Sequence, residues 1–190
     1  MRATGGVAVR AITVAGAIGL GLVQGACAPG ADEVLLEREG SIARAVAVLR
    51  PTAGYEASGR VSFSPVGGAV RIDADLDGLS PGEHGIHVHE FGDCSAPDAA
   101  SAGGHFDPEG IPHAGPDSVE RHVGDLGNLT ADSTGAAHFE RVDALVALDG
   151  PRSILGRAIV VHAAADDLTS QPSGAAGDRV ACGVIGIAGP

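Results

Sequence analysis

Two short stretches decide the fold class: SGRVSFS (Ser58–Ser64) and AVRIDADL (Ala69–Leu76). Polar and apolar residues alternate along both, which is typical of β-strands that bury one face, because successive side chains of a strand point to opposite sides of the sheet. Working outward, we expect further strands at Ile42–Arg50, Gly85–Glu90, Ala136–Val142, Ala158–Ala163 and Val180–Ile187. Seven or eight short strands without a long segment of helical period predict an all-β domain, an antiparallel sandwich or barrel.

Two segments between the expected strands are too long for simple turns. They are Phe91–Leu129 and Ala164–Arg179. Loops of that length in a compact domain are usually either functional or disordered. Both contain residue types that bind metals, so we expect them to carry the functional site.

The composition excludes several classes of protein. The 190 residues include 24 Asp and Glu against 12 Arg and no Lys, which gives a formal net charge of −12. This balance argues against a nucleic-acid-binding protein, which needs a clustered excess of basic residues. The hydrophobic fraction of 44% and the charged fraction of 19% argue against global disorder. The length fits one domain, or at most two small ones.

The first residues have the organisation of an export signal. Arg2 and Arg10 are the only charges before Asp32, and an apolar run covers Ala11–Val23. The run is too short to span a bilayer as a helix, which needs about 20 residues, but it suits the hydrophobic region of a secretory signal. We interpret residues 1–27 as the signal, 28–41 as a tether and 42–190 as the folded domain.

Two cleavage sites remain open for this signal. Small residues precede Cys27, as they precede the lipidated cysteine of bacterial lipoproteins, although Gln24 replaces the usual Leu. Lipidation of Cys27 would anchor the protein on the outer face of the bacterial cytoplasmic membrane. Ordinary signal-peptidase cleavage after Ala31 would release a secreted protein instead. Both alternatives predict export.

Export makes the remaining two cysteines informative. An even pair in an oxidising compartment usually forms a disulfide. We expect Cys94 and Cys182 to be bonded, which closes a loop of 88 residues. The chain-entropy model gives such a bond at most about 4–5 kcal/mol of stabilisation. Two buried free thiols are the alternative.

One expected strand contains the sequence His87-Val88-His89. Because strand side chains alternate, His87 and His89 point to the same face and Val88 to the other. Two imidazoles on one face can bind a single transition-metal ion. A chance pair of histidines on a core strand is the alternative interpretation.

The first long loop supplies a second set of ligand-type residues. It contains three histidines and a carboxylate within 21 residues: His105, His113, His122 and Asp125. Three imidazoles and one carboxylate make a tetrahedral zinc set with every position filled by protein, which is typical of structural zinc. A solvated loop with scattered histidines is the alternative. His162, at the end of another apolar run, precedes Asp166.

Five motifs, in family order, closely resemble those of copper–zinc superoxide dismutases. They are HGIHVHEFGD (His84–Asp93), SAGGHFDP (Ser101–Pro108), RHVGDLGN (Arg121–Asn128), GRAIVVH (Gly156–His162) and RVACGVIGIA (Arg179–Ala188). The resemblance covers Ile42–Ala188 and leaves only the signal and the tether outside. It implies an eight-stranded antiparallel Greek-key barrel with two long metal-binding and active-site loops, of the bacterial secreted or lipoprotein type.

The resemblance also implies one copper and one zinc per subunit. The residues that match copper ligands are His87, His89, His105 and His162. Those that match zinc ligands are His105, His113, His122 and Asp125. His105 belongs to both sets as a bridging imidazolate, with one ring nitrogen for each metal.

Further roles follow from the same resemblance. Asp166 matches the carboxylate that bonds one copper ligand, His87, and one zinc ligand, His113. Arg179 matches the anion-binding arginine beside copper. Cys94 and Cys182 match the family disulfide. His84 is structural in the family, and His138 has no implied role.

The implied function is dismutation of superoxide to oxygen and hydrogen peroxide by one-electron cycling of copper, which would protect the cell envelope from extracellular superoxide. Arg179 would attract the anion and His105 would take up a proton. A copper chaperone or metal buffer and a structural protein with a decayed site are the alternatives, and the complete ligand set favours the enzyme. The sequence leaves open whether the protein is a monomer or a homodimer.

One feature departs from eukaryotic relatives, which carry Lys and Glu in the second long loop. Here that loop is short and lacks Lys, and Asp178 directly precedes Arg179. The body of the protein is acidic, so attraction of an anion would depend on local focusing near Arg179. We therefore expect weaker electrostatic steering than in those relatives.

Overall fold

The structure, a computed structural model, describes residues 42–189. These residues form nine β-strands and one short 3-10 turn, η2 (Ala100–Ala102). The strands are β1 (Ala45–Pro51), β2 (Ser58–Val66), β3 (Ala69–Asp77), β4 (Gly82–His89), β5 (Asp125–Ala131), β6 (Ala137–Asp143), β7 (Ala158–His162), β8 (Arg179–Val184) and β9 (Gly186–Ile187). The predicted signal at 1–27, the tether at 28–41 and Cys27 lie outside the described residues.

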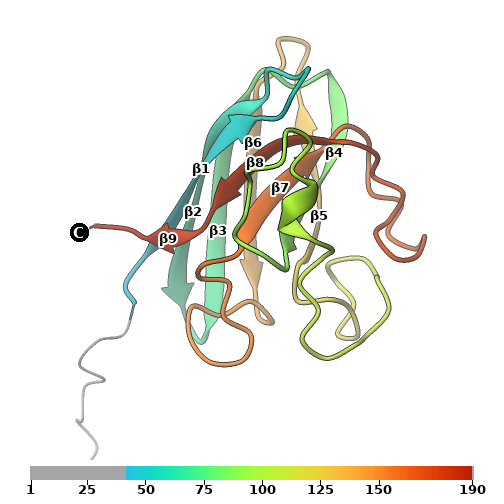
Figure 1. The fold of residues 1–190 in the computed structure, drawn as a ribbon. Helices are drawn as coiled ribbons and strands as arrows, with labels where there is room; N and C mark the ends of the chain where they lie inside the picture. Colours follow the sequence, from blue (N-terminus) through green and yellow to red (C-terminus); the bar gives the residue numbers. More distant parts are fainter. Residues whose placement is uncertain (1–41, 190) are drawn as a thin grey trace, which may run out of the picture. The chain divides into compact units, whose positions relative to one another are not determined.

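The strands close into a barrel (Figure 1). Their spatial order is β2-β3-β6-β5-β4-β7-β8-β1, every pairing is antiparallel, and β1 also pairs with β2. β9 pairs with the start of β1. Because β3 pairs with β6 and not with β4, the chain crosses between the two halves in a Greek-key connection. The predicted eight-stranded antiparallel Greek-key barrel is confirmed.

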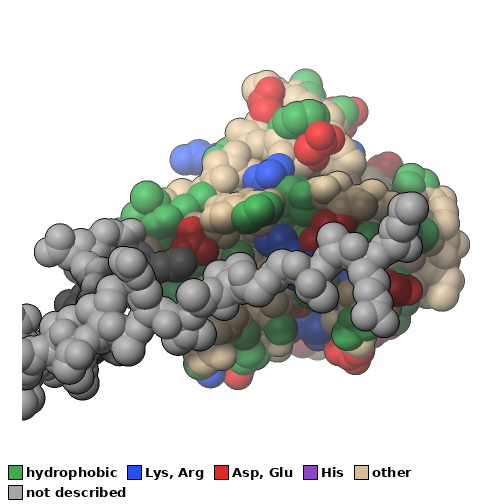
Figure 2. Space-filling view, turned by 90° about the horizontal axis from the view of Figure 1, so that it is seen from below, with side chains coloured by type: hydrophobic (Ala, Val, Ile, Leu, Met, Phe, Trp, Pro, Cys, Tyr) green, Lys and Arg blue, Asp and Glu red, His purple; other side chains and the backbone are tan. Residues whose placement is uncertain are grey.

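Alternation along the strands places their apolar faces in the barrel. In β3, Val70, Ile72, Ala74 and Leu76 are buried while the residues between them face outward. Phe63 of β2 is fully buried in the same core. On the face seen in Figure 2, acidic, basic and hydrophobic side chains are interspersed where the described residues form the surface. Among the described residues, no helix has the length and apolar character needed to cross a membrane.

The structure corrects one boundary of the first long loop. We predicted a loop to Leu129, but β5 begins at Asp125. Its sequence does not alternate, because the β4–β5 register shifts between Gly85 and His87 and Gly127 has a φ of +84°. Such a bulge interrupts the two-residue period on which the prediction relied.

Several other strand boundaries differ from the prediction; β4, for example, begins at Gly82, three residues before the predicted Gly85. The first strand begins at Ala45, three residues after Ile42. The predicted strand Val180–Ile187 is divided into β8 and β9 at Ile185. The backbone N–H and C=O of Ile185 bond with residues 156–157, which precede β7, so Ile185 does not continue the ladder with β1.

The disulfide predicted between Cys94 and Cys182 is present, with an S–S distance of 2.02 Å. It ties the start of the β4–β5 connection to β8. The buried side chains of Ala99, Ala102 and Val160 pack around it. The segment that leads to His105 is thereby held against the barrel wall, beside the ends of β4 and β7.

Candidate metal centre

Four histidines converge at one side of the barrel. We call them the four-histidine group: His87, His89, His105 and His162. His87 and His89 project from β4 as alternation predicted, and His162 ends the neighbouring strand β7. His105 comes from the β4–β5 connection, where its backbone forms an isolated bridge with His89. Their four ligand nitrogens lie within 4.8 Å of one another.

Hydrogen bonds determine which ring nitrogen each of three histidines turns toward the group. The Nδ1 atoms of His89 and His162 lie 3.0 and 3.1 Å from the carbonyl oxygens of Gly103 and Gly177. Their Nε2 atoms therefore face each other, 3.3 Å apart. His87 is turned the other way, because its Nε2 lies 2.8 Å from Asp166 Oδ2. A second partner of this kind orients a ligating imidazole and selects its tautomer.

The second set, the histidine–aspartate group, centres on the first residue of β5. It comprises His105, His113, His122 and Asp125. Asp125 Oδ1 lies 2.8, 3.0 and 3.1 Å from the Nδ1 atoms of the three histidines. Zinc bonds of about 2.0–2.1 Å in a tetrahedron place neighbouring ligand atoms about 3.3 Å apart. The four atoms already approach that spacing, so the donor set and its dimensions fit a zinc ion.

Backbone donors hold Asp125 in place. Its second oxygen, Oδ2, accepts hydrogen bonds from the backbone N–H groups of His122 at 3.0 Å and Ala114 at 3.2 Å. Burial opposes ionisation of Asp125, but the three imidazoles outweigh it and lower its pKa. Asp125 is therefore a carboxylate, the form that binds a cation.

His105 joins the two groups through its two ring nitrogens. Its Nδ1 faces Asp125, and its Nε2 is on the side of the four-histidine group, where the His87 ring centroid lies 4.0 Å from its own. Within residues 42–189, three buried side-chain nitrogens make no hydrogen bond of acceptable geometry: His87 Nδ1, His105 Nε2 and His113 Nδ1, the last of which contacts Asp125 only as an ion-pair neighbour. An unsatisfied buried polar group costs about 1–3 kcal/mol, and metal coordination would remove that cost. All three belong to the ligand groups, so the residues fit two metal ions.

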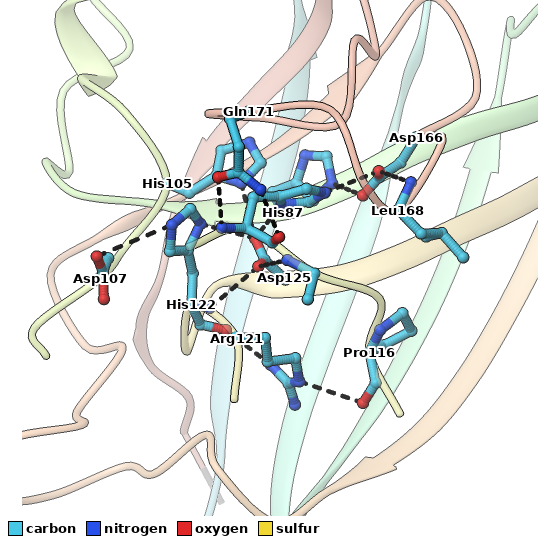
Figure 3. Close-up of polar contacts among 12 residues, drawn as sticks. His87, His105, Asp107, Pro116, Arg121, His122, Asp125, Asp166, Leu168 and Gln171 are labelled. Carbon is cyan, nitrogen blue, oxygen red and sulfur yellow. Dashed lines mark hydrogen bonds and ion pairs between the residues drawn. The ribbon is translucent and has the colours of Figure 1, made fainter. Parts of the chain in front are cut away.

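Asp166 connects the groups a second time (Figure 3). Its Oδ2 contacts His87 Nε2, and its Oδ1 lies 3.0 Å from His113 Nε2. Asn128 of β5 pairs with the Asp166 backbone in both directions, at 2.7 and 2.8 Å. The carboxylate thus orients one histidine from each group and is itself fixed to the barrel.

A family model described as copper/zinc superoxide dismutase (SODC) matches residues 57–185. The chain belongs to the copper/zinc superoxide dismutase family. Among solved structures, the chain is similar to one titled as the clock protein EA4, with 44% sequence identity and a TM-score of 0.72. The match covers 78% of this chain and 97% of the other.

In this superoxide dismutase-family chain, Gln171 holds the backbone of His113 in the histidine–aspartate group, a role that the sequence did not predict. Its side-chain amide accepts a hydrogen bond from the His113 N–H at 2.9 Å and donates one to the His113 carbonyl at 2.7 Å. The two bonds link the two long loops, because His113 and Gln171 are 58 positions apart in the sequence; Gln171 is labelled in Figure 3. A lone glutamine in a polar loop carries no sequence signal for this role.

Arg121 supports the neighbouring ligand, His122, and was also missed. Its guanidinium donates to the His122 carbonyl at 2.9 Å and pairs with the buried Asp143 of β6 at 2.5 Å. A further bond, at 3.2 Å, reaches the Pro116 carbonyl (Figure 3). The side chain is buried, so it ties the loop that carries His122 to the barrel.

A cavity opens onto the four-histidine group. It is lined by His89, His105, His162 and Arg179, together with glycines of both long loops. Arg179 is the only Arg or Lys among the described residues that line it. Its guanidinium donates to the carbonyl oxygens of Ala99 at 2.5 Å and Gly103 at 2.6 Å. The carboxylate of Asp107 also lines the cavity, so a small anion that enters meets one negative side chain there as well as the positive charge of Arg179.

The remaining two histidines lie outside both groups. His84 is buried, with Nδ1 2.7 Å from the His162 carbonyl and Nε2 2.7 Å from the Ser80 carbonyl. His138 is exposed on β6, where its Nδ1 contacts Asp75 at 2.7 Å.

Proposed function

We propose that this protein dismutates superoxide to oxygen and hydrogen peroxide. Copper would bind the four-histidine group and zinc the histidine–aspartate group. The observation that carries the proposal is the position of His105, which offers one nitrogen to each group while Nε2 has no hydrogen-bond partner among the described residues. Family membership and the complete donor sets support the choice of metals.

The two donor sets suit different ions. Imidazoles without a carboxylate suit copper, which can change its charge by one electron, whereas three imidazoles and a carboxylate suit zinc, which has no redox chemistry. Copper, when bound, supplies the electron transfer that dismutation needs. Zinc would fix His105, His113 and His122 around Asp125 and would leave no position open to substrate.

The side chains of the chain provide the remaining chemistry. Arg179 attracts the superoxide anion into the cavity and positions it beside the histidines. His105 can hold a proton at Nε2 and release it to the product, since peroxide leaves protonated. Burial lowers the pKa of the metal-free His105 to about 4, although its contact with Asp125 opposes the shift, so the ring is neutral at neutral pH and has a nitrogen lone pair to offer to a cation. Asp166 keeps the His87 and His113 rings oriented throughout.

The decisive experiment is a dismutation assay of residues 28–190 loaded with copper and zinc, with a zinc-only sample as the control. Superoxide dismutase is itself a known example of an enzyme near the diffusion limit, so we expect copper-dependent turnover approaching about 10⁸–10⁹ M⁻¹s⁻¹. Copper binding at the four-histidine group without turnover would contradict the proposal. That result would favour a metal buffer or copper chaperone on the same fold.

We also propose that the protein acts outside the cytoplasm, in the envelope of a bacterial cell. The Cys94–Cys182 disulfide supports export, because such bonds persist in oxidising compartments. We propose attachment to the membrane through lipidated Cys27. A Cys27→Ser variant should then move from the membrane fraction to the soluble fraction, and retention at the membrane would contradict the anchor. Secretion after cleavage at Ala31 is the alternative.

A further inference from the structure

Asp178, the acid directly before Arg179, is not among the described residues that line the cavity at the four-histidine group. Its Oδ2 accepts a hydrogen bond of 2.9 Å from the hydroxyl of Tyr55. Tyr55 belongs to the turn between β1 and β2, so a residue far away in the sequence binds this carboxylate. Both side chains are exposed and line a hollow that also includes Arg179 but none of the histidines.

Among residues 42–189, Arg179 makes no ion pair. Its guanidinium donates to two carbonyl oxygens, and no carboxylate in the described part of the chain lies within 4.0 Å of it. Of the acids nearby, Asp98 has the main electrostatic influence on Arg179. The Asp98 carboxylate, in turn, accepts a hydrogen bond from the Ala100 N–H at 2.9 Å. Two acids thus flank the arginine, and each is bound by another donor.

The β1–β2 turn is well placed to hold this arrangement. The Thr52 hydroxyl donates to the Arg179 carbonyl at 2.6 Å, and the Thr52 N–H donates to the Val180 carbonyl at 3.1 Å. The Ala53 N–H donates to the Pro97 carbonyl at 2.7 Å. The β1–β2 turn therefore bonds both to the start of β8, which carries Arg179, and to Pro97 in the β4–β5 connection. Tyr55 lies in the same turn.

We propose that Tyr55 is a positioning residue for anion binding at Arg179, because its hydroxyl holds the Asp178 carboxylate away from the guanidinium. A released Asp178 could pair with its neighbour Arg179 and compete with the incoming anion. This proposal rests on the proposed function, since it assigns the anion site of the same cavity. It also explains how an acid next to the arginine is compatible with attraction of superoxide.

The chain offers a direct test of the Tyr55–Asp178 bond. Tyr55 is the only tyrosine and the sequence has no tryptophan, so the ultraviolet absorbance of the phenolate reports on this residue alone. The bond to Asp178 raises the pKa of Tyr55 above 10.0. An Asp178→Asn variant should lower that pKa toward 10.0, in zinc-loaded protein without any assay of turnover. An unchanged titration would overturn the proposal.

The consequence for anion binding is tested with azide as the probe, on the copper- and zinc-loaded protein at low ionic strength. Tyr55→Phe should bind azide about fivefold more weakly, because an exposed ion pair is worth up to about 1 kcal/mol and 1.4 kcal/mol is tenfold. Asp178→Asn should bind azide at least as tightly as wild type. The double variant should regain wild-type affinity. Glu140→Gln, which removes one exposed negative charge on β6, controls for net charge.

Wild-type affinity in Tyr55→Phe, or a double variant as weak as Tyr55→Phe, would overturn the proposal, as would absence of azide binding to the wild type. The azide measurements do not depend on turnover. If the loaded protein failed to dismutate superoxide, the proposed function would fail, while the azide affinities of the wild type and its variants would still decide the role of Tyr55.

Discussion

The two ligand groups share His105 but are supported in different ways. In the four-histidine group, the other three side chains come from β4 and β7, neighbouring strands joined by main-chain hydrogen bonds. In the histidine–aspartate group, all three histidines lie in the β4–β5 connection, and His113 and His122 lie outside any strand or bridge. Loops must be held by side chains instead, and this is where Gln171 and Arg121 act. Strand pairing therefore positions most of the four-histidine group, whereas side-chain bonds between loops position His113 and His122.

The pKa values of the histidines also differ between the two groups. Burial lowers the pKa of His162 to about 3 and that of His89 well below its usual value. Burial also opposes protonation of His113, but its contacts with Asp125 and Asp166 outweigh burial and raise its pKa to about 9. The first group thus offers neutral nitrogens at neutral pH. The second has a carboxylate at its centre, which favours a cation, either protons or a metal.

The largest effect is expected where the groups meet. Replacing His105 with Ala removes a ligand nitrogen from both groups and the Nε2 that would hold a proton. Loss of a residue that only hydrogen-bonds to a metal ligand typically lowers activity or metal affinity about 10–100-fold. Because His105 is itself a ligand, we expect the dismutation rate to fall more than about 100-fold. Zinc affinity should fall with it. The measurements are the dismutation rate and a zinc competition titration.

The matched control for this prediction is His138→Ala, which removes an exposed histidine outside both groups and should change neither quantity. Full turnover in the His105→Ala variant would refute the bridging role.

Loop support should matter for one group only. Gln171→Ala removes both hydrogen bonds to the His113 backbone, and we expect zinc to bind about 10–100-fold more weakly while copper affinity changes little. Thr169→Ala, an exposed change in the same loop, is the control and should leave both affinities unchanged. Equal loss of both metals in the Gln171→Ala variant would show that the groups are not supported separately.

The pKa contrast predicts a stability maximum for the metal-free protein near pH 6.5. His105 and His162 have folded pKa values of about 4 and about 3, below the unfolded 6.5, so stability falls as the pH drops below about 6.5. The raised pKa of His113 adds to the free energy of unfolding, and this addition is fully present below pH 6.5 and is lost as the pH rises toward about 9. Each pKa unit corresponds to about 1.4 kcal/mol, so the acid loss amounts to a few kcal/mol.

Chemical unfolding of the metal-free protein at pH values of about 5, 6.5 and 9 measures this curve. His162→Ala should flatten the acid side, because it removes one histidine with a lowered pKa. A free energy of unfolding that rises steadily as the pH falls to 5 would contradict the lowered pKa values of the four-histidine group.

The smallest effect concerns electrostatic steering. Arg179 is the one Arg or Lys among the described residues that line the cavity, and the net charge of the whole chain is −12. We expect the dismutation rate to fall less than about threefold between ionic strengths of about 0.01 M and 0.15 M, where the Debye length shortens from about 30 to 8 Å. A steep fall would reveal long-range steering that the charge balance does not predict.

Much of the fold could be predicted from local pattern. Alternation identified β2 and β3 nearly to the residue, because one buried face imposes a period of two. The same period placed His87 and His89 on one face of β4. β5 escaped this reasoning, since a bulge and a glycine with positive φ break the period. A pattern can reveal a strand only where the strand is regular.

The order of residue types along the chain was enough to predict the alternating strands, the histidines and carboxylate of both groups, and the family motifs. Three features became visible only in the folded chain: which nitrogen of each histidine faces its group, the hydrogen bonds by which Gln171 holds His113, and the bond of Asp178 to Tyr55 instead of Arg179. The physical reason is that each of these choices depends on a hydrogen-bond partner from a distant segment. Such partners meet only when β4 pairs with β7 and the two long loops close over the same end of those strands.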